Sequence, residues 1–143
     1  MSFDSQVLGR VYFLRWKQPQ VGDVAEIVDE VEAASQRARA KLCYVALAPD
    51  DSPPPDKDTR DAMATALERL AKCCDSIHLV FEGSGFRQSL KRTAIAGVMI
   101  ATGRGRSIQV HASMDEVAMA LPNLPEIARL RDQLRGGVVA RAV

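Results

Sequence analysis

The stretch LCYVALA, residues 42–48, is apolar throughout and has the length of one strand. An unbroken apolar run of this length is typical of a strand that is buried on both faces, as in the centre of a parallel sheet. The consecutive prolines in the next stretch, residues 49–58, fix φ and remove backbone donors, so neither a strand nor a helix continues there. The sequence therefore predicts a central strand followed by a proline-rich loop.

Helical patterns lie on both sides of this strand. Apolar residues recur at spacings of about three and four residues over residues 21–39, and again from residue 59 to about residue 75. Each set would lie along one face of a helix. Asp58 or Thr59 is the expected N-cap of the second helix, because a short polar side chain there can accept a hydrogen bond from a free backbone N–H.

Further strands and helices complete an alternating order. Branched and aromatic residues predict more strands, over residues 7–16, 76–82 and 107–112. Ser113 and Glu116 form a capping box for a short helix, and residues 125–135 predict a last helix. Parallel neighbours need crossover connections, so this order favours an α/β fold. We expect one mostly parallel sheet of about four strands with flanking helices, in a single domain over residues 1–137 with a flexible tail at 138–143.

Composition and charge restrict the class of protein. The chain has 143 residues, of which 47% are hydrophobic and 26% are charged, as in an ordinary globular domain. A net charge of +1 and an aromatic content of 5% give no support for a nucleic-acid partner. No stretch approaches the roughly 20 uncharged apolar residues of a membrane span, and we expect a cytoplasmic protein. The 3 cysteines are expected to be reduced thiols that serve as small apolar residues.

A family resemblance is carried by residues 81–121, where a strand, a glycine turn, a basic helix, a strand and a capped short helix follow in order. Over about residues 7–121 the chain resembles the STAS superfamily, which includes bacterial anti-sigma factor antagonists, and STAS-like bacterial proteins of unknown role. The antagonists carry a phosphorylated serine in an Asp-Ser pair that is followed by glycine. Here the pair is followed by proline, and the resemblance implies two candidate phosphoacceptors, Ser52 and Thr59.

The glycine turn at residues 83–85 lies between a predicted strand and a predicted helix. Backbone amides at such a turn can bind an anion beside the positive end of the helix dipole, and basic side chains follow here. The candidate anion site consists of Gly83, Ser84, Gly85, Arg87, Lys91 and Arg92. The alternative is a tight turn followed by a solvated basic face.

The second half of the same helix, residues 94–101, is apolar on all sides. A helix on the outside of a sheet needs cover on more than one side if it has this composition. Either the last helix covers it, or it is a surface for a partner or for a second copy of the chain. The candidate interface consists of Ile95, Ala96, Gly97, Val98, Met99 and Ile100.

Catalytic and metal-binding patterns are missing from the sequence. No Ser-His-Asp order, carboxylate pair or metal-ligand spacing surrounds His78 or His111, so we interpret both as structural histidines. We expect no cofactor, no metal and no enzymatic activity. The sequence favours a regulatory or scaffolding module that binds a protein partner, a homodimer included. The alternatives are a small-anion or nucleotide sensor at the glycine turn, and an enzyme whose base comes from the acidic loop.

Overall fold

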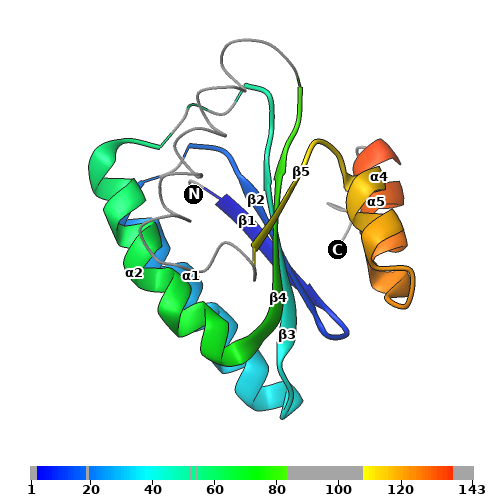
Figure 1. The fold of residues 1–143 in the computed structure, drawn as a ribbon, viewed down its shortest axis with the longest axis horizontal. Coiled ribbons are helices and arrows are strands. Elements are labelled where there is room, and N and C mark those ends of the chain that lie inside the picture. The colour runs from blue at the N-terminus through cyan, green and yellow to red at the C-terminus, as the bar shows by residue number, and fades with distance from the viewer. Residues whose placement is uncertain (1–2, 19, 52, 54, 84–107, 137–143) are drawn as a thin grey trace.

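The computed structural model describes residues 3–18, 20–51, 53, 55–83 and 108–136 (Figure 1). Within these residues one sheet contains β1 (Phe3–Leu8), β2 (Val11–Trp16), β3 (Leu42–Ala48), β4 (Cys74–Phe81) and β5 (Ile108–His111). The helices are α1 (Val21–Ala38), α2 (Lys57–Cys73), α4 (Met114–Ala120) and α5 (Pro125–Gly136). The strands lie side by side in chain order, β2 to β5 parallel and β1 antiparallel to β2. The expected α/β class with a mostly parallel sheet is confirmed.

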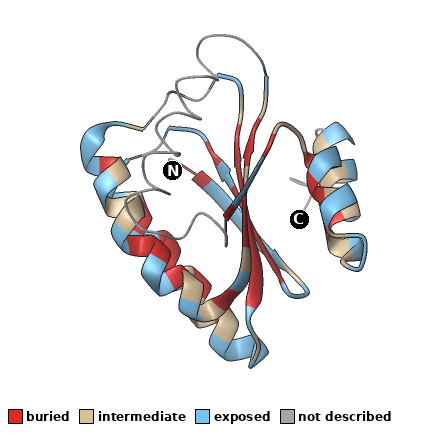
Figure 2. Ribbon diagram, in the orientation of Figure 1, coloured by how far each residue is buried: buried red, intermediate tan, exposed pale blue. Residues whose placement is uncertain are grey.

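Helices cover both faces of the sheet. α1 and α2 pack on one face, and α4 and α5 lie on the opposite side (Figure 1). Figure 2 shows the buried residues along the sheet and along the sides of the helices that face it. The core under α4 and α5 includes Val45, Val80, Met114, Val117, Ile127 and Leu130. In the described part of the chain no helix combines the length and apolar character needed to cross a membrane.

β3 is the central strand, as predicted from its composition. All of its residues are buried, and it pairs with β2 on one side and β4 on the other. Its side chains point alternately into the two cores. Tyr44 stacks on Tyr12 with ring centroids 5.8 Å apart under α1 and α2, whereas Val45 faces the core under α4 and α5. A strand with cover on both faces needs apolar residues at every position.

The start of the chain corrects one prediction. The single strand expected over residues 7–16 is wrong, because β1 and β2 form an antiparallel hairpin that turns at Gly9 and Arg10. Gly9 has φ of 58°, a backbone conformation that favours glycine. The turn was not predicted because the residues on both sides of Gly9 are typical of strands. Phe3 is buried and meets Trp16 edge-on at 6.0 Å between ring centroids. The sheet gains a strand beyond the expected four.

The helix caps also differ in part from the predictions. α2 begins at Lys57 with Asp56 as its N-cap, so the expected cap at Asp58 or Thr59 is wrong. Several short polar residues follow one another there, and only the path of the loop selects between them. The cap of α4 is confirmed, because the backbone N–H of Glu116 donates to Ser113 Oγ at 3.3 Å.

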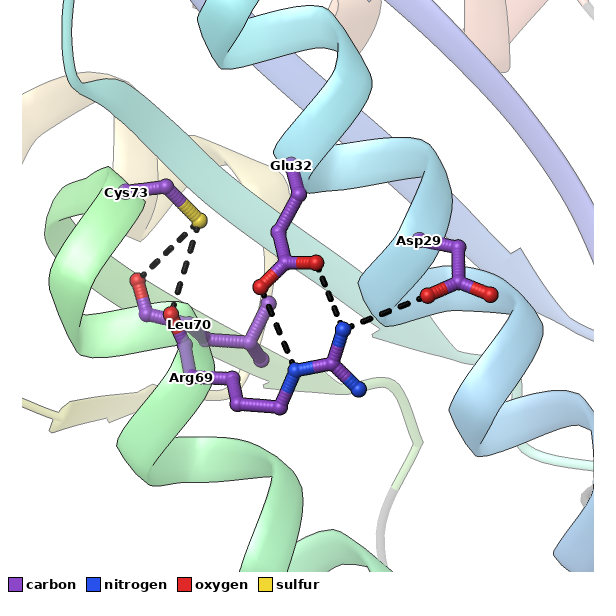
Figure 3. Close-up of polar contacts among 5 residues, drawn as sticks. All are labelled: Asp29, Glu32, Arg69, Leu70 and Cys73. Atoms are coloured by element: carbon purple, nitrogen blue, oxygen red, sulfur yellow. Dashed lines mark hydrogen bonds and ion pairs between the residues drawn. The ribbon is translucent and has the colours of Figure 1, made fainter.

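An ion-pair cluster joins the exposed sides of α1 and α2 (Figure 3). Arg69 of α2 donates from Nε to Glu32 Oε2 at 3.2 Å and from Nη2 to Asp29 Oδ1 at 3.3 Å. Nη2 also donates to Glu32 Oε1, so the guanidinium binds this carboxylate through two nitrogens. Because the members of the cluster are partly exposed, we expect it to stabilise the fold only modestly.

Candidate functional site

The carboxyl ends of β3 and β4 bring two regions of the sequence together. The strands pair as far as Ala48 and Phe81, and the backbone N–H of Glu82 donates to the carbonyl of Ala48 at 3.1 Å. Beyond this point the Asp50 carboxylate lies against Gly83, so that a Cβ added to Gly83 would stand 2.3 Å from Asp50 Oδ1. Gly83 also has φ of +92°, which side chains rarely tolerate. Asp50 of the proline-rich loop and Gly83 are therefore neighbours.

Thr59 lies in the first turn of α2, the helix that follows the proline-rich loop. Asp56 Oδ1 accepts a hydrogen bond from the Thr59 backbone N–H at 2.8 Å, and this bond holds the pKa of Asp56 below its ordinary value. The side chain of Thr59 is fully buried, and its hydroxyl makes no well-formed hydrogen bond in the described part of the chain, although it lies close enough to the Asp56 carboxylate to help lower the pKa of that group. A kinase can reach this hydroxyl only after the start of α2 opens.

Most of the residues predicted for a site lie outside the described residues. Only Thr59 and Gly83 are described. The others are Ser52, Ser84, Gly85, Arg87, Lys91, Arg92, Ile95, Ala96, Gly97, Val98, Met99 and Ile100. The anion site, the first phosphoacceptor and the helical interface therefore stay predictions, and so does the tail at 138–143.

A pair of buried histidines joins β4 to β5. His78 is 1% exposed and His111 is 8% exposed. His78 Nδ1 and His111 Nε2 are 3.0 Å apart, which is a hydrogen-bond distance, and their ring centroids are 5.2 Å apart. In the sheet register His78 lies beside Gln109 and His111 lies beside Val80, so the bond runs diagonally between the strands. The sequence places each histidine on a predicted strand, but only the pairing of β4 with β5 brings them into contact.

The two ends of the histidine pair differ in their surroundings. His78 Nε2 has no hydrogen-bond partner within the described part of the chain, whereas His111 Nδ1 lies 3.9 Å from Glu116 Oε1. Burial and the neighbouring histidine lower the pKa of His78 from 6.5 to about 4. Burial also lowers the pKa of His111, against the effect of Glu116. Both rings are therefore neutral at pH 7.

The cysteines are free thiols in this structure. Cys43 and Cys74 are buried and Cys73 is half-buried. Burial raises the pKa of each thiol, so all three are protonated at neutral pH and are poor nucleophiles. Ser76 Oγ donates to Cys43 Sγ at 3.4 Å. Among the described residues, no group of three or more His, Cys, Asp or Glu side chains is placed to hold a metal ion.

Comparisons with protein-family models, with curated proteins and with solved structures found no match to this chain. The STAS-like interpretation therefore depends on the order of elements alone. The structure differs from the expected order in its N-terminal hairpin, which gives the sheet five strands. Among the described residues, two features are candidates for a functional site, the edge at Asp50 and Gly83 and the pair of His78 and His111.

Proposed function

We propose that the chain is a cytoplasmic, STAS-like regulatory or scaffolding module without enzymatic activity, which binds a protein partner at the carboxyl edge of β3 and β4. The contact between Asp50 and Gly83 carries the proposal. It supports one continuous surface from two regions that the sequence singled out separately, the loop with the candidate phosphoacceptors and the glycine turn. In open α/β sheets this edge is the usual place for a binding site.

The charge at this edge favours a protein partner over a small anion. Asp51 and Asp58 are exposed on the proline-rich loop and at the start of α2. A free phosphate bound at this edge would therefore meet exposed like charges. A partner with a basic surface fits better. Phosphorylation of Ser52 or Thr59 would add about −1.5 to −2 charges beside these aspartates and would change the affinity for such a partner.

A charge reversal at this edge tests the proposal. Tagged protein is recovered from its own cells after cross-linking, and its solution mass is measured for the wild type, Asp51→Lys and Glu68→Lys. Both substituted residues are exposed, but Glu68 lies in the middle of α2, so its variant is a matched control for the change in charge. We expect the wild type and Glu68→Lys to carry a partner that Asp51→Lys loses.

Two results would contradict this function. A partner that stays bound to Asp51→Lys as firmly as to Glu68→Lys would place the interface elsewhere on the molecule. A wild type that is monomeric and free of partners in cross-linked cells would remove the scaffolding role. Sedimentation of the purified protein over a range of concentrations separates a homodimer from a complex with a different protein, because only the homodimer forms without the cell extract.

A further inference from the structure

β5 and α4 form one continuous segment at the end of the sheet. β5 has 4 residues and pairs with β4 from Ile108 to His111. Ala112 and Ser113 then lead directly into α4, whose buried Met114 and Val117 complete the core under α4 and α5. Such a short strand makes few ladder hydrogen bonds, so side-chain contacts contribute much of what holds this segment to β4.

The histidine pair is the polar contact between this segment and β4. His78 comes from β4, and His111 is the last residue of β5. Glu116 Oε1 accepts a hydrogen bond from the Ala112 backbone N–H at 3.0 Å and lies 3.9 Å from His111 Nδ1. The same carboxylate therefore helps to start α4 and faces the outer end of the histidine pair.

The number of protons on the two rings makes this contact sensitive to acid. The short distance between His78 Nδ1 and His111 Nε2 requires one proton between the two nitrogens. The nearby Glu116 carboxylate favours the neutral tautomer in which His111 Nδ1 carries a proton, so we assign His78 Nδ1 as the donor to His111 Nε2 and leave His78 Nε2 with only its lone pair. A further proton then has one free nitrogen to occupy, His78 Nε2. That nitrogen is buried and has no acceptor among the described residues, so protonation creates a positive ring with an unsatisfied N–H in the core.

The charged groups around the pair do not remove this cost. Asp75 on β4 and Glu116 on α4 both favour a proton on the histidines, but burial outweighs them. β3 presents the apolar Val45 to His78. Arg131 and Arg135 of α5 pair with Asp115 of α4.

We propose that the His78–His111 pair is a pH-operated latch, which holds β5 and α4 on the sheet when neutral and releases them when it takes up a proton. Release lets the rings reach water, so the open state binds the proton more tightly. Between the ordinary histidine pKa of 6.5 and the value of about 4 for His78, the opening equilibrium should rise about tenfold for each unit by which the pH falls. The proposal is independent of the function proposed above, because it depends only on β4, β5 and α4.

Amide hydrogen exchange of the full chain tests the latch. Exchange is followed from pH 7 to pH 5 and corrected for the intrinsic rate at each pH, for residues 108–120 and for β3 as an internal reference. We expect the protection of residues 108–120 to fall by about tenfold or more while β3 keeps its protection. If the two segments lose protection together, acid unfolds the whole domain and the latch proposal is overturned.

Two variants separate a latch from a merely structural pair. His78→Asn with His111→Gln keeps a neutral hydrogen bond within reach but removes both titrating rings, so protection should no longer depend on pH; a dependence that persists overturns the proposal. Glu116→Gln keeps an acceptor for Ala112 but removes the negative charge beside His111. Because this charge favours a proton on the closed pair, its loss lowers the pKa of the closed state further below that of the open state, so the fall in protection at pH 5 should be at least as large as in the wild type. This variant tests the latch even if the double variant does not fold; a clearly smaller fall counts against the latch.

Discussion

Replacing Thr59 by valine should make the protein more stable. Thr59 is 0% exposed, and within the described residues its hydroxyl makes no well-formed hydrogen bond, only a weaker contact with the Asp56 carboxylate. In the unfolded chain the hydroxyl bonds to water, so folding gives up those bonds without replacing them. Valine has the same branched shape and a similar helix propensity, and it carries a methyl group in place of the hydroxyl. The substitution therefore removes a desolvation cost and leaves the packing unchanged.

The size of the effect follows from the burial. An unsatisfied buried hydroxyl costs about 1–3 kcal/mol, and we expect Thr59→Val to recover about 1 kcal/mol of the free energy of unfolding. This corresponds to a rise in Tm of roughly 3–5 °C for a domain of this size. The matched variant Thr59→Ser keeps the hydroxyl and deletes a buried methyl group, so it should lose about 1 kcal/mol.

Urea unfolding of the wild type and the two variants, followed by far-UV circular dichroism, measures both differences in the free energy of unfolding, with one m-value used for all three proteins. A Thr59→Val protein that loses about 1 kcal/mol or more would refute the reasoning, because it would mean that the hydroxyl makes a hydrogen bond that stabilises the start of α2. The expected gain also bears on regulation. A threonine that costs stability at this position is easier to understand if its hydroxyl serves another purpose, such as the phosphorylation predicted from the sequence.

The remaining predictions concern backbone strain and surface charge. Gly83→Ala should destabilise the fold by about 1–3 kcal/mol in urea unfolding, because the residue has φ of +92° and the new Cβ would overlap Asp50. Gly22→Ala, in open space on α1, is its control and should instead stabilise by up to about 1 kcal/mol; equal losses would contradict the argument. Arg69→Met should lower the free energy of unfolding only slightly, and the loss should shrink in added salt, since Glu32 and the arginine are partly exposed; a loss that salt does not change would point to packing instead.

The sequence predicted the sheet correctly where the residues of one strand alone indicate its position. β3 is buried on both faces and is apolar at every position, so composition alone indicated its central place. The N-terminal hairpin was missed because the residues on both sides of Gly9 have strand character, and the turn depends on the positive φ of that one glycine. The start of α2 was displaced because Asp56, Asp58 and Thr59 are all suitable caps.

The candidate sites depend on contacts that no local pattern contains. His78 and His111 were each placed on a strand, but their hydrogen bond requires both the neighbourhood of β4 and β5 and their register. The same holds for Asp50 and Gly83, which meet because parallel neighbours end at one edge. Sequence periods describe one element at a time, whereas these pairs are properties of two elements and of the way in which they align.

Parallel topology also places the two proposed features close to each other. His111 is the register partner of Val80, and the next residue of β4, Phe81, is the partner of Ala48, beyond which the proline-rich loop begins. The last residues of β4 therefore pair with β5, which carries His111, on one side, and with the end of β3, which leads to Asp50, on the other. Suppose that a partner binds this edge only while β5 is in place. Closing the latch then raises the affinity for the partner, and binding the partner raises the population of the closed latch by the same factor, because the coupling between two linked equilibria is reciprocal. Proton uptake at the histidines would then weaken partner binding without any charge change at the interface itself.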